Sequence, residues 1–424
     1  MTSPDPALPL EGLRVLDLTS SVVGPYATQI LADYGADVIK VEQQSGDIIR
    51  WISGRSPTPG MSGKFMHMNR NKRSLSIDLK SRAGRRVLMA LAAKADIFIH
   101  NMRADAAERL GIRYEDILAV NDRILYCAIT GFGSGGPYAG RPAYDSVLQG
   151  GTGLASLFAG KQGEGEPRFV PYVVVDRTVG LMTVNAVLAA VVARQARPGP
   201  RAIEVPMFES YASLILSEHL YGETFEPPIS GGSERGEPGG HFISSSGDSR
   251  LLDPNAKPVK TLDGYLCITT NTDAQVMALF DAIGRPELKE DPRFRRAVDR
   301  IDHIGEFFAI RAAALAARGT DEWLEILDRH DIPAMPCHTV DTLLRDPHIV
   351  AVGLVESVPH PSQGRVKHIR VPVHMSDCQP ALRRHAPRVG EQTADILAEL
   401  GYEPEAIAAM LASGEAYAPE DAAG

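Results

Sequence analysis

Short apolar runs alternate with longer amphipathic stretches in the N-terminal part of the chain. Residues 13–19, 37–42, 96–100 and 124–130 have the length and content of buried strands. Between them, helical spacing predicts helices that start at Gly24-Pro25 and end at Tyr34, span 82–95, and end at Leu110. Strand and helix therefore alternate as βαβ units, which have parallel strands and right-handed crossovers. We predict an α/β domain with a doubly wound, Rossmann-like sheet.

The pattern changes after residue 222, where glycine, proline and serine become frequent. We interpret 1–222 as the N-terminal part of the large domain and 223–256 as a linker. A smaller mixed α/β domain is predicted for 257–332, with a strand at 265–269 and alanine- and leucine-rich helices. Residues 333–424 are interpreted as a second connector and a C-terminal part that returns to the large domain. Its final helix is predicted near 393–400.

Composition is that of an ordinary globular protein and excludes some functions. Among 424 residues, 44% are hydrophobic and 23% charged, and the net charge of −9 disfavours a nucleic-acid binder with a basic face. The four cysteines are far apart and form no CxxC pair, so we predict neither a metal site nor a disulfide framework. The start of the chain has no secretion-signal pattern and no stretch has the flanks of a membrane span. We expect a cytoplasmic protein.

One carboxylate stands where an apolar run changes to a helical pattern. The run 169–175 is strand-like, and 177–196 has apolar residues at helical spacing. Asp176 is thus predicted to be the N-cap of that helix, where free N–H groups and the helix dipole favour its ionised form. A carboxylate in such a place can be a nucleophile, or it can simply cap the helix. The local sequence leaves both interpretations open.

Individually weak motifs follow one another along almost the whole chain. They comprise 10–17, Gly24-Pro25, 35–42, 71–74 with 78–80, 101–103 with 109–111, 130–133, 136–137, Tyr144-Asp145 with Gln149, 261–265, 291–294, 332–334 and 346–348. In this order and spacing the chain resembles the class III CoA-transferase family, which also contains α-methylacyl-CoA racemases and formyl-CoA transferase. The resemblance implies an interlocked homodimer, with each chain passing through a ring made by the other.

The resemblance also implies a chemistry. Asp176 would attack an acyl-CoA donor, and the reaction would pass through an aspartyl anhydride and an aspartyl-CoA thioester before CoA reaches a carboxylic acid acceptor. Coenzyme A thioester would be a substrate, with no tightly bound cofactor, no metal, no nucleic acid and no membrane as partner. The runs 231–240 and 244–247 would supply oxyanion contacts or a lid. The CoA contacts it implies are Gln43, Asn71, Lys72, Arg73, Asn101, Met102, Arg103 and Arg109.

Three alternatives remain. A racemase needs two acid/base groups, but Tyr144 occupies the place of that branch's histidine, and no histidine lies between His100 and His219. A nicotinamide-dependent dehydrogenase is disfavoured because the turn at 19–24 lacks GxGxxG. A non-catalytic CoA-binding protein stays possible. Val22 and Gln43 replace a glutamine and an arginine of formyl-CoA transferase, which argues against formyl or oxalate as the acyl group.

Overall fold

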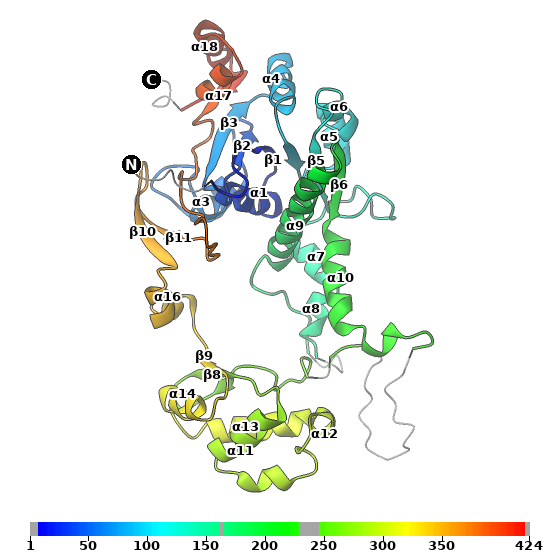
Figure 1. The fold of residues 1–424 in the computed structure, drawn as a ribbon, viewed down its shortest axis with the longest axis vertical. Helices are drawn as coiled ribbons and strands as arrows, with labels where there is room; N and C mark the ends of the chain where they lie inside the picture. Colours follow the sequence, from blue (N-terminus) through cyan, green and yellow to red (C-terminus); the bar gives the residue numbers. More distant parts are fainter. Residues whose placement is uncertain (1–6, 161–164, 229–245, 249, 420–424) are drawn as a thin grey trace. The chain divides into compact units, whose positions relative to one another are not determined.

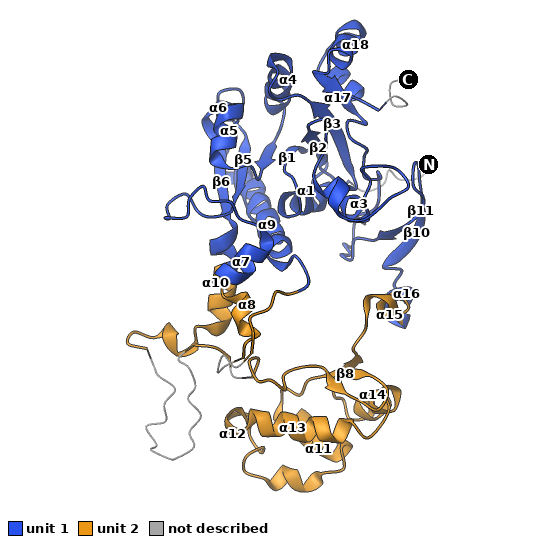
Figure 2. Ribbon diagram, turned by 180° about the vertical axis from the view of Figure 1, so that it is seen from behind, with its two compact units in different colours: residues 1–151, 171–211, 347–424 blue, residues 152–170, 212–346 orange. Residues whose placement is uncertain are grey.

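The computed structural model describes residues 7–160, 165–228, 246–248 and 250–419. These residues form two compact units (Figure 2). Unit 1 contains residues 1–151, 171–211 and 347–424, and unit 2 contains residues 152–170 and 212–346. Both ends of the chain therefore belong to unit 1, and the chain leaves and re-enters this unit more than once.

A single sheet forms the centre of unit 1 (Figure 1). Among the described residues it has seven strands in the order β12-β3-β2-β1-β4-β5-β6. All neighbouring pairs are parallel except β12 with β3, so the predicted parallel α/β sheet is confirmed. The strands are β1 (Arg14–Leu18), β2 (Asp37–Glu42), β3 (Lys72–Ile77), β4 (Ile97–His100), β5 (Leu125–Thr130), β6 (Arg201–Pro206) and β12 (Ala416–Tyr417).

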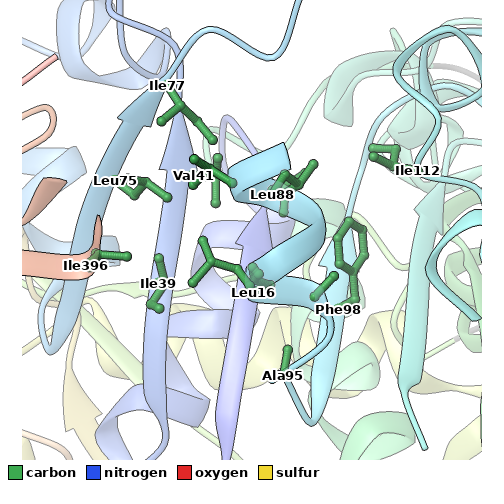
Figure 3. Packing of buried hydrophobic residues seen from close by; sticks show 14 of the residues in the cluster. Leu16, Ile39, Val41, Leu75, Ile77, Leu88, Ala95, Phe98, Ile112 and Ile396 are labelled. Carbon is green, nitrogen blue, oxygen red and sulfur yellow. The ribbon is translucent and has the colours of Figure 1, made fainter. Parts of the chain in front are cut away.

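Helices cover both faces of this sheet, as parallel strands require. On one face, α4 (Arg82–Ala92), α17 (Thr393–Glu399) and α18 (Pro404–Ala412) contribute to a core with the strands. Figure 3 shows Leu88 of α4 and Ile396 of α17 directed at Leu16, Ile39 and Leu75 of the strands. On the other face, α1 (Val23–Asp33) packs on β1 and β2, while α9 (Val174–Ala196) packs on β5 and β6.

Helix α9 also packs along α1, and a glycine makes their close approach possible. A Cβ atom at Gly180 would lie 3.0 Å from both the Tyr26 ring and the carbonyl oxygen of Val23. By length and composition alone, α9 is the one helix in the described part of the chain that could cross a membrane. It packs against α1, α7, β5 and β6.

The C-terminal segment departs from the sequence prediction. The helix expected near 393–400 is α17, but it is not the last element, because α18 and β12 follow it. Strand β12 pairs antiparallel with β3 through Ala416 and Tyr417 and extends the sheet. A strand of two residues is too short to show a period-two pattern, so it could not be predicted from the sequence.

Unit 2 has its own small sheet and its own core. Strands β7 (Val259–Lys260), β8 (Tyr265–Ile268) and β9 (Ala334–Pro336) pair antiparallel. Helices α11 (Asp273–Ala282), α13 (Ile304–Leu315) and α14 (Thr320–Arg329) pack on them around Phe280, Phe294 and Phe307. The remaining elements of unit 2 are α8 (Leu154–Leu157), α10 (Met207–His219, which begins in unit 1), η1 (Tyr221–Thr224), η2 (Pro286–Glu290), α12 (Ala297–Asp302) and α15 (Val340–Leu343).

The rest of unit 1 consists of short helices and a hairpin. The antiparallel hairpin is β10 (Val355–His360) with β11 (Gly364–Ile369). Helix α3 packs against α1 and α2, and α7 packs against α9, so both border the region described next. These helices are α2 (Ile49–Ile52), α3 (Gly63–Asn69), α5 (Ala104–Leu110), α6 (Tyr114–Leu118), α7 (Asp145–Gly151) and α16 (Pro347–Ala351).

Candidate active site

Asp176 lies inside the first turn of α9, which begins at Val174. The prediction that it is the N-cap is wrong, since Val173 holds that position. The apolar run before it is not a strand either, because 169–173 has no regular structure. Val173 instead packs against a core formed by residues of α2 and α3. Helix α9 therefore starts earlier than the sequence pattern suggests, and Asp176 belongs to its first turn.

A second carboxylate, Asp145 at the start of α7, takes the capping role. Its Oδ1 accepts a hydrogen bond of 3.0 Å from the backbone N–H of Asp176. Its Oδ2 accepts one of 2.6 Å from Nε2 of Gln149, which also donates to the Tyr172 carbonyl at 3.2 Å. Asp145 and Gln149 are both buried. Two residues of this motif, Asp145 and Gln149, therefore fix the position of the first turn of α9.

The surroundings of Asp176 oppose its negative charge. Burial and, to a smaller extent, the neighbouring charge of Asp145 raise the pKa of the Asp176 carboxyl, while Lys64 and Arg177 lower it, and the resulting pKa is about 7. The expectation that the helix terminus favours the ionised form is therefore wrong for the net effect. The backbone N–H of Asp176 does not offset this effect, because it donates to the Asp145 carboxylate. A carboxyl of this kind is protonated and ionised in similar amounts near neutral pH.

The parallel strands β1, β2 and β4 have their carboxyl ends at the same edge of the sheet. The strand order reverses between β1 and β4. Strands β1 to β3 lie on one side of this point and β4 to β6 on the other, an arrangement that places ligand sites outside it. Asn101, directly after β4, joins the two sides by accepting from the Ser20 N–H and donating to the Ser20 carbonyl, both at 2.9 Å. Gln43, directly after β2, is exposed. Two of the predicted CoA contacts thus follow strands that end at this edge.

Three further predicted contacts follow Asn101 on the same loop and helix. Met102 is half-buried and packs on the main core, with its N–H donated to Nδ1 of His100 at 3.1 Å. The side chains of Arg103 and Arg109 are 57% and 70% exposed, and both form ion pairs with Asp105. A single exposed carboxylate therefore holds two guanidinium groups in place, which leaves donors of both available to a phosphate.

The other three predicted contacts, Asn71, Lys72 and Arg73, have internal partners instead. Lys72 has no exposed side-chain surface, and its ammonium group contacts Asp17, Asn69 and the Pro25 carbonyl at 2.8–3.1 Å. Arg73 pairs with Asp37 and Glu399. Asn71 donates to Asp33 and to the Ala381 carbonyl.

These partners give Lys72 an identifiable place in a buried ionic network. Burial alone would raise the pKa of Asp17, but Lys72 and Lys40 lower it to about 2. Burial lowers the pKa of Lys72 to about 8 in spite of Asp17. Lys40 in turn contacts Asp47 at 3.0 Å. In this structure the motif around Lys72 therefore connects β1, β2 and β3 below the edge of the sheet.

The sequence interpretation missed two sets of cations. Lys64 and His67 lie on α3, and Arg177 follows Asp176 on α9. They have no motif of their own, so only the fold shows that the charges of Lys64 and Arg177 act on Asp176 and that the charge of Arg177 acts on His67. The second set consists of Arg82, Arg85 and Arg86 of α4, which line a hollow together with Met89. An arginine cluster in the first turns of a helix opposes the helix dipole, which is the signal that could have drawn attention to it.

Comparison with known proteins identifies the family. The family model for CoA-transferase family III matches residues 10–393. The chain belongs to CoA-transferase family III.

Individual relatives agree with this assignment over nearly their full length. The chain is 29% identical to a succinate–glutarate CoA-transferase of Agrobacterium fabrum, covering 92% of this chain and 96% of that protein. It is 31% identical to a formyl-CoA:oxalate CoA-transferase of Streptomyces coelicolor, covering 96% and 98%. The crystal structure of Rv3272 from Mycobacterium tuberculosis superposes with a TM-score of 0.76 at 29% identity, covering 92% and 99%.

As a family III CoA-transferase, the protein uses CoA thioesters as substrates. The predicted oxyanion or lid segments at 231–240 and 244–245 lie outside the described residues. Of that prediction the structure describes Gly247, whose N–H donates to the His219 carbonyl at 2.8 Å. Within the described part of the chain, no three or more His, Cys, Asp or Glu side chains are grouped as metal ligands would be.

Proposed function

We propose that the protein transfers CoA from an acyl-CoA donor to a carboxylic acid through Asp176. The observation that carries this proposal is the partly buried carboxyl of Asp176, set in the first turn of α9 by the Asp145 side chain. A carboxylate that is partly removed from water is a stronger nucleophile than a solvated one. Its pKa of about 7 keeps a useful ionised fraction at neutral pH.

The proposed reaction begins with two displacements. Ionised Asp176 attacks the thioester carbonyl, a C–O bond forms, the C–S bond breaks and CoA leaves as thiolate. The thiolate then attacks the carboxyl carbon of Asp176 in the mixed anhydride. This step forms an aspartyl-CoA thioester and releases the donor acid as its carboxylate.

The second half repeats the same chemistry in reverse order. The acceptor carboxylate attacks the aspartyl-CoA thioester and displaces the thiolate, which leaves a second anhydride. The thiolate then attacks the acceptor's acyl carbon, so acceptor-CoA forms and the Asp176 carboxylate is regenerated. No proton is consumed overall. The covalent intermediates divide one difficult exchange into several easier steps.

We propose that CoA binds along the edge where β1, β2 and β4 end. Arg103 and Arg109 would contact its phosphates, because their guanidinium groups are exposed and charge-assisted contacts favour phosphate. Asn101, Met102 and Gln43 lie at the same edge and would line the site. Asn71, Lys72 and Arg73 would support the edge from within through the buried contacts described above.

Relatives guide the choice of substrates and the assembly. The names of the relatives include succinate with glutarate and formyl-CoA with oxalate, so a short acyl-CoA donor and a small acid acceptor are the first to test. We also propose an interlocked homodimer, because both ends of the chain lie in unit 1 and unit 2 is inserted between them.

The decisive experiment looks for the covalent intermediate. Incubation with succinyl-CoA followed by acid quench and mass spectrometry should show a CoA adduct on the peptide that contains Asp176. Asp176→Asn should form none, whereas the exposed control Asp122→Asn should form as much as the wild type. If quenched wild-type enzyme turns over without any adduct, direct transfer between bound substrates replaces this mechanism.

The racemase alternative makes a different prediction. Its second base would have to come from the position of Tyr144, which is 73% exposed and carries a phenol where the racemase branch has a histidine. A 2-methylacyl-CoA incubated in deuterium oxide should therefore gain little deuterium at its α-carbon while an added acid becomes a CoA ester. Fast α-deuteration without transfer would favour the racemase.

A further inference from the structure

Asp176 is accompanied by cationic side chains from two helices. Lys64 of α3 and Arg177 of α9 both lower the pKa of the Asp176 carboxyl, so their charges lie close to it. Within the described residues, neither forms an ion pair with a carboxylate, and the buried Arg177 Nε has no hydrogen-bond partner. These two cations therefore stand beside the nucleophile with hydrogen-bond donors that no protein group uses.

Packing between helices holds the two cations on one side. The guanidinium carbon of Arg177 lies 4.3 Å from the centre of the Tyr26 ring of α1. Helix α3 contacts α1 through a core that includes Phe65, with Tyr26 packed against it. The Arg177 guanidinium and the helix that carries Lys64 therefore both pack against α1.

The face that α3 presents can also be identified. Lys64 and His67 are three residues apart on α3, which places them on one face of the helix. The charge of Arg177 lowers the pKa of His67, and the charge of Lys64 lowers the pKa of Asp176. This face of α3 is thus directed at the start of α9.

The charge at this place favours an additional anion once Asp176 is acylated, because its carboxyl then carries no charge. The ionisable groups that face Asp176 or its neighbours are Lys64, His67 and Arg177, together with Asp145. The Asp145 carboxylate is already occupied by the Asp176 N–H and by Gln149. Burial, Arg70 and Arg177 lower the pKa of His67, so its ring is neutral near pH 7. Two permanent cations thus face the Asp145 carboxylate and the carboxyl of Asp176, which loses its charge when it is acylated.

We propose that Lys64 and Arg177 bind the free carboxylate of a dicarboxylic acid while its other carboxylate reacts at Asp176. This inference rests on the proposed function and names its substrate class. Donor and acceptor react in turn at the same aspartate, so their acyl groups occupy the same place. The two cations would therefore select both a dicarboxylic acceptor and a dicarboxylic mono-CoA thioester as donor. Guanidinium and ammonium groups are the side chains that recognise such carboxylates.

The test compares acids that differ only in the second carboxylate. With succinyl-CoA as donor, kcat/KM is measured for glutarate against pentanoate and for adipate against hexanoate. A charge-assisted contact that only one acid of each pair can make should favour the dicarboxylate by about tenfold or more. Lys64→Met and Arg177→Met should bring this ratio towards one, and Lys64→Arg should keep it high. The exposed control Lys94→Met should keep the wild-type ratio.

The ratio is measured within each variant, so a partly inactive preparation does not alter it. A wild-type ratio near one, or an unchanged ratio in both methionine variants, overturns the inference. A separate measurement tests the proposed function alone: wild-type enzyme should exchange labelled succinate into succinyl-CoA when no other acid is present. Exchange without dicarboxylate preference would refute the cation site and leave CoA transfer standing. No exchange would refute the covalent transfer and the inference together.

Discussion

The first prediction concerns the effect of Asp145 on the ionisation of Asp176. Only the ionised carboxylate can attack the thioester, and the pKa of Asp176 is raised to about 7. A group with that pKa is roughly one-tenth ionised at pH 6 and nine-tenths ionised at pH 8. We therefore expect the rate of adduct formation at saturating succinyl-CoA to rise about ninefold between these two pH values. An aspartate with its ordinary pKa of 3.8 would give no such rise.

The variant Asp145→Asn separates the causes of this shift. It removes the like charge, and the remaining amide oxygen can still accept from the Asp176 N–H. The acid limb should therefore move to lower pH. It should stay above the ordinary range, because burial is the larger cause and is unchanged.

Rapid-quench mass spectrometry from pH 5.5 to 8.5 measures the rate of adduct formation directly. Titration of the CoA phosphates affects every variant equally, because every variant receives the same donor, and so cancels when variants are compared. Asp116→Asn is the matched control, since Asp116 accepts a backbone N–H at the start of α6, remote in sequence from Asp176. Its acid limb should coincide with that of the wild type. A pH-independent wild-type rate, or an Asp145→Asn profile that coincides with the wild type, would refute the electrostatic reasoning.

Three further outcomes are expected. Asp176→Asn should lose transfer but gain stability. The native pKa of about 7 lies above the ordinary 3.8, so the free energy of unfolding of the wild type falls between about pH 4 and pH 7, and at pH 8 that of the variant should be higher by at most about 4 kcal/mol, with no difference below pH 4, measured by urea denaturation. Arg103→Ala should raise the KM for acyl-CoA about tenfold or more without a similar change for the acceptor acid, whereas Arg113→Ala, an exposed arginine that also pairs with carboxylates, should change neither. Lys72→Met should destabilise the fold by about 3–5 kcal/mol because it leaves the buried Asp17 without its partner, and an effect confined to the KM for CoA would show instead that Lys72 contacts the ligand.

Much of the sheet could be predicted from the sequence. The segment 37–42 is β2 with the same bounds, and the predicted strands at 13–19, 96–100 and 124–130 contain β1, β4 and β5. Buried parallel strands are short and almost wholly apolar, so they stand out from the amphipathic helices between them. Strand β3 did not stand out, because its inward positions include Lys72, Ser74 and Ser76. The burial of the Lys72 and Ser74 side chains is compensated by Asp17 and Glu42, which lie far away in the sequence.

The candidate nucleophile, Asp176, was selected from its place in the sequence, but its ionisation was not predicted correctly. Position 176 could be singled out because a helical pattern begins there and the family motifs surround it. Its raised pKa depends on burial and on Asp145, which is 31 residues away in the sequence. Local reasoning could weigh only the helix terminus, which acts in the opposite direction. The sign of the pKa shift was therefore decided by packing.

The same distinction applies to the charged residues. The sequence by itself determined which arginines and lysines belong to family motifs, and so selected Lys72 together with Arg103. Only the tertiary structure separated them, with Lys72 enclosed by Asp17 and Asn69 and Arg103 exposed on α5. It alone also brought Lys64 of α3 towards Asp176 of α9. Burial and pairing are properties of contacts between distant segments, and a charge acts on whatever the fold places beside it.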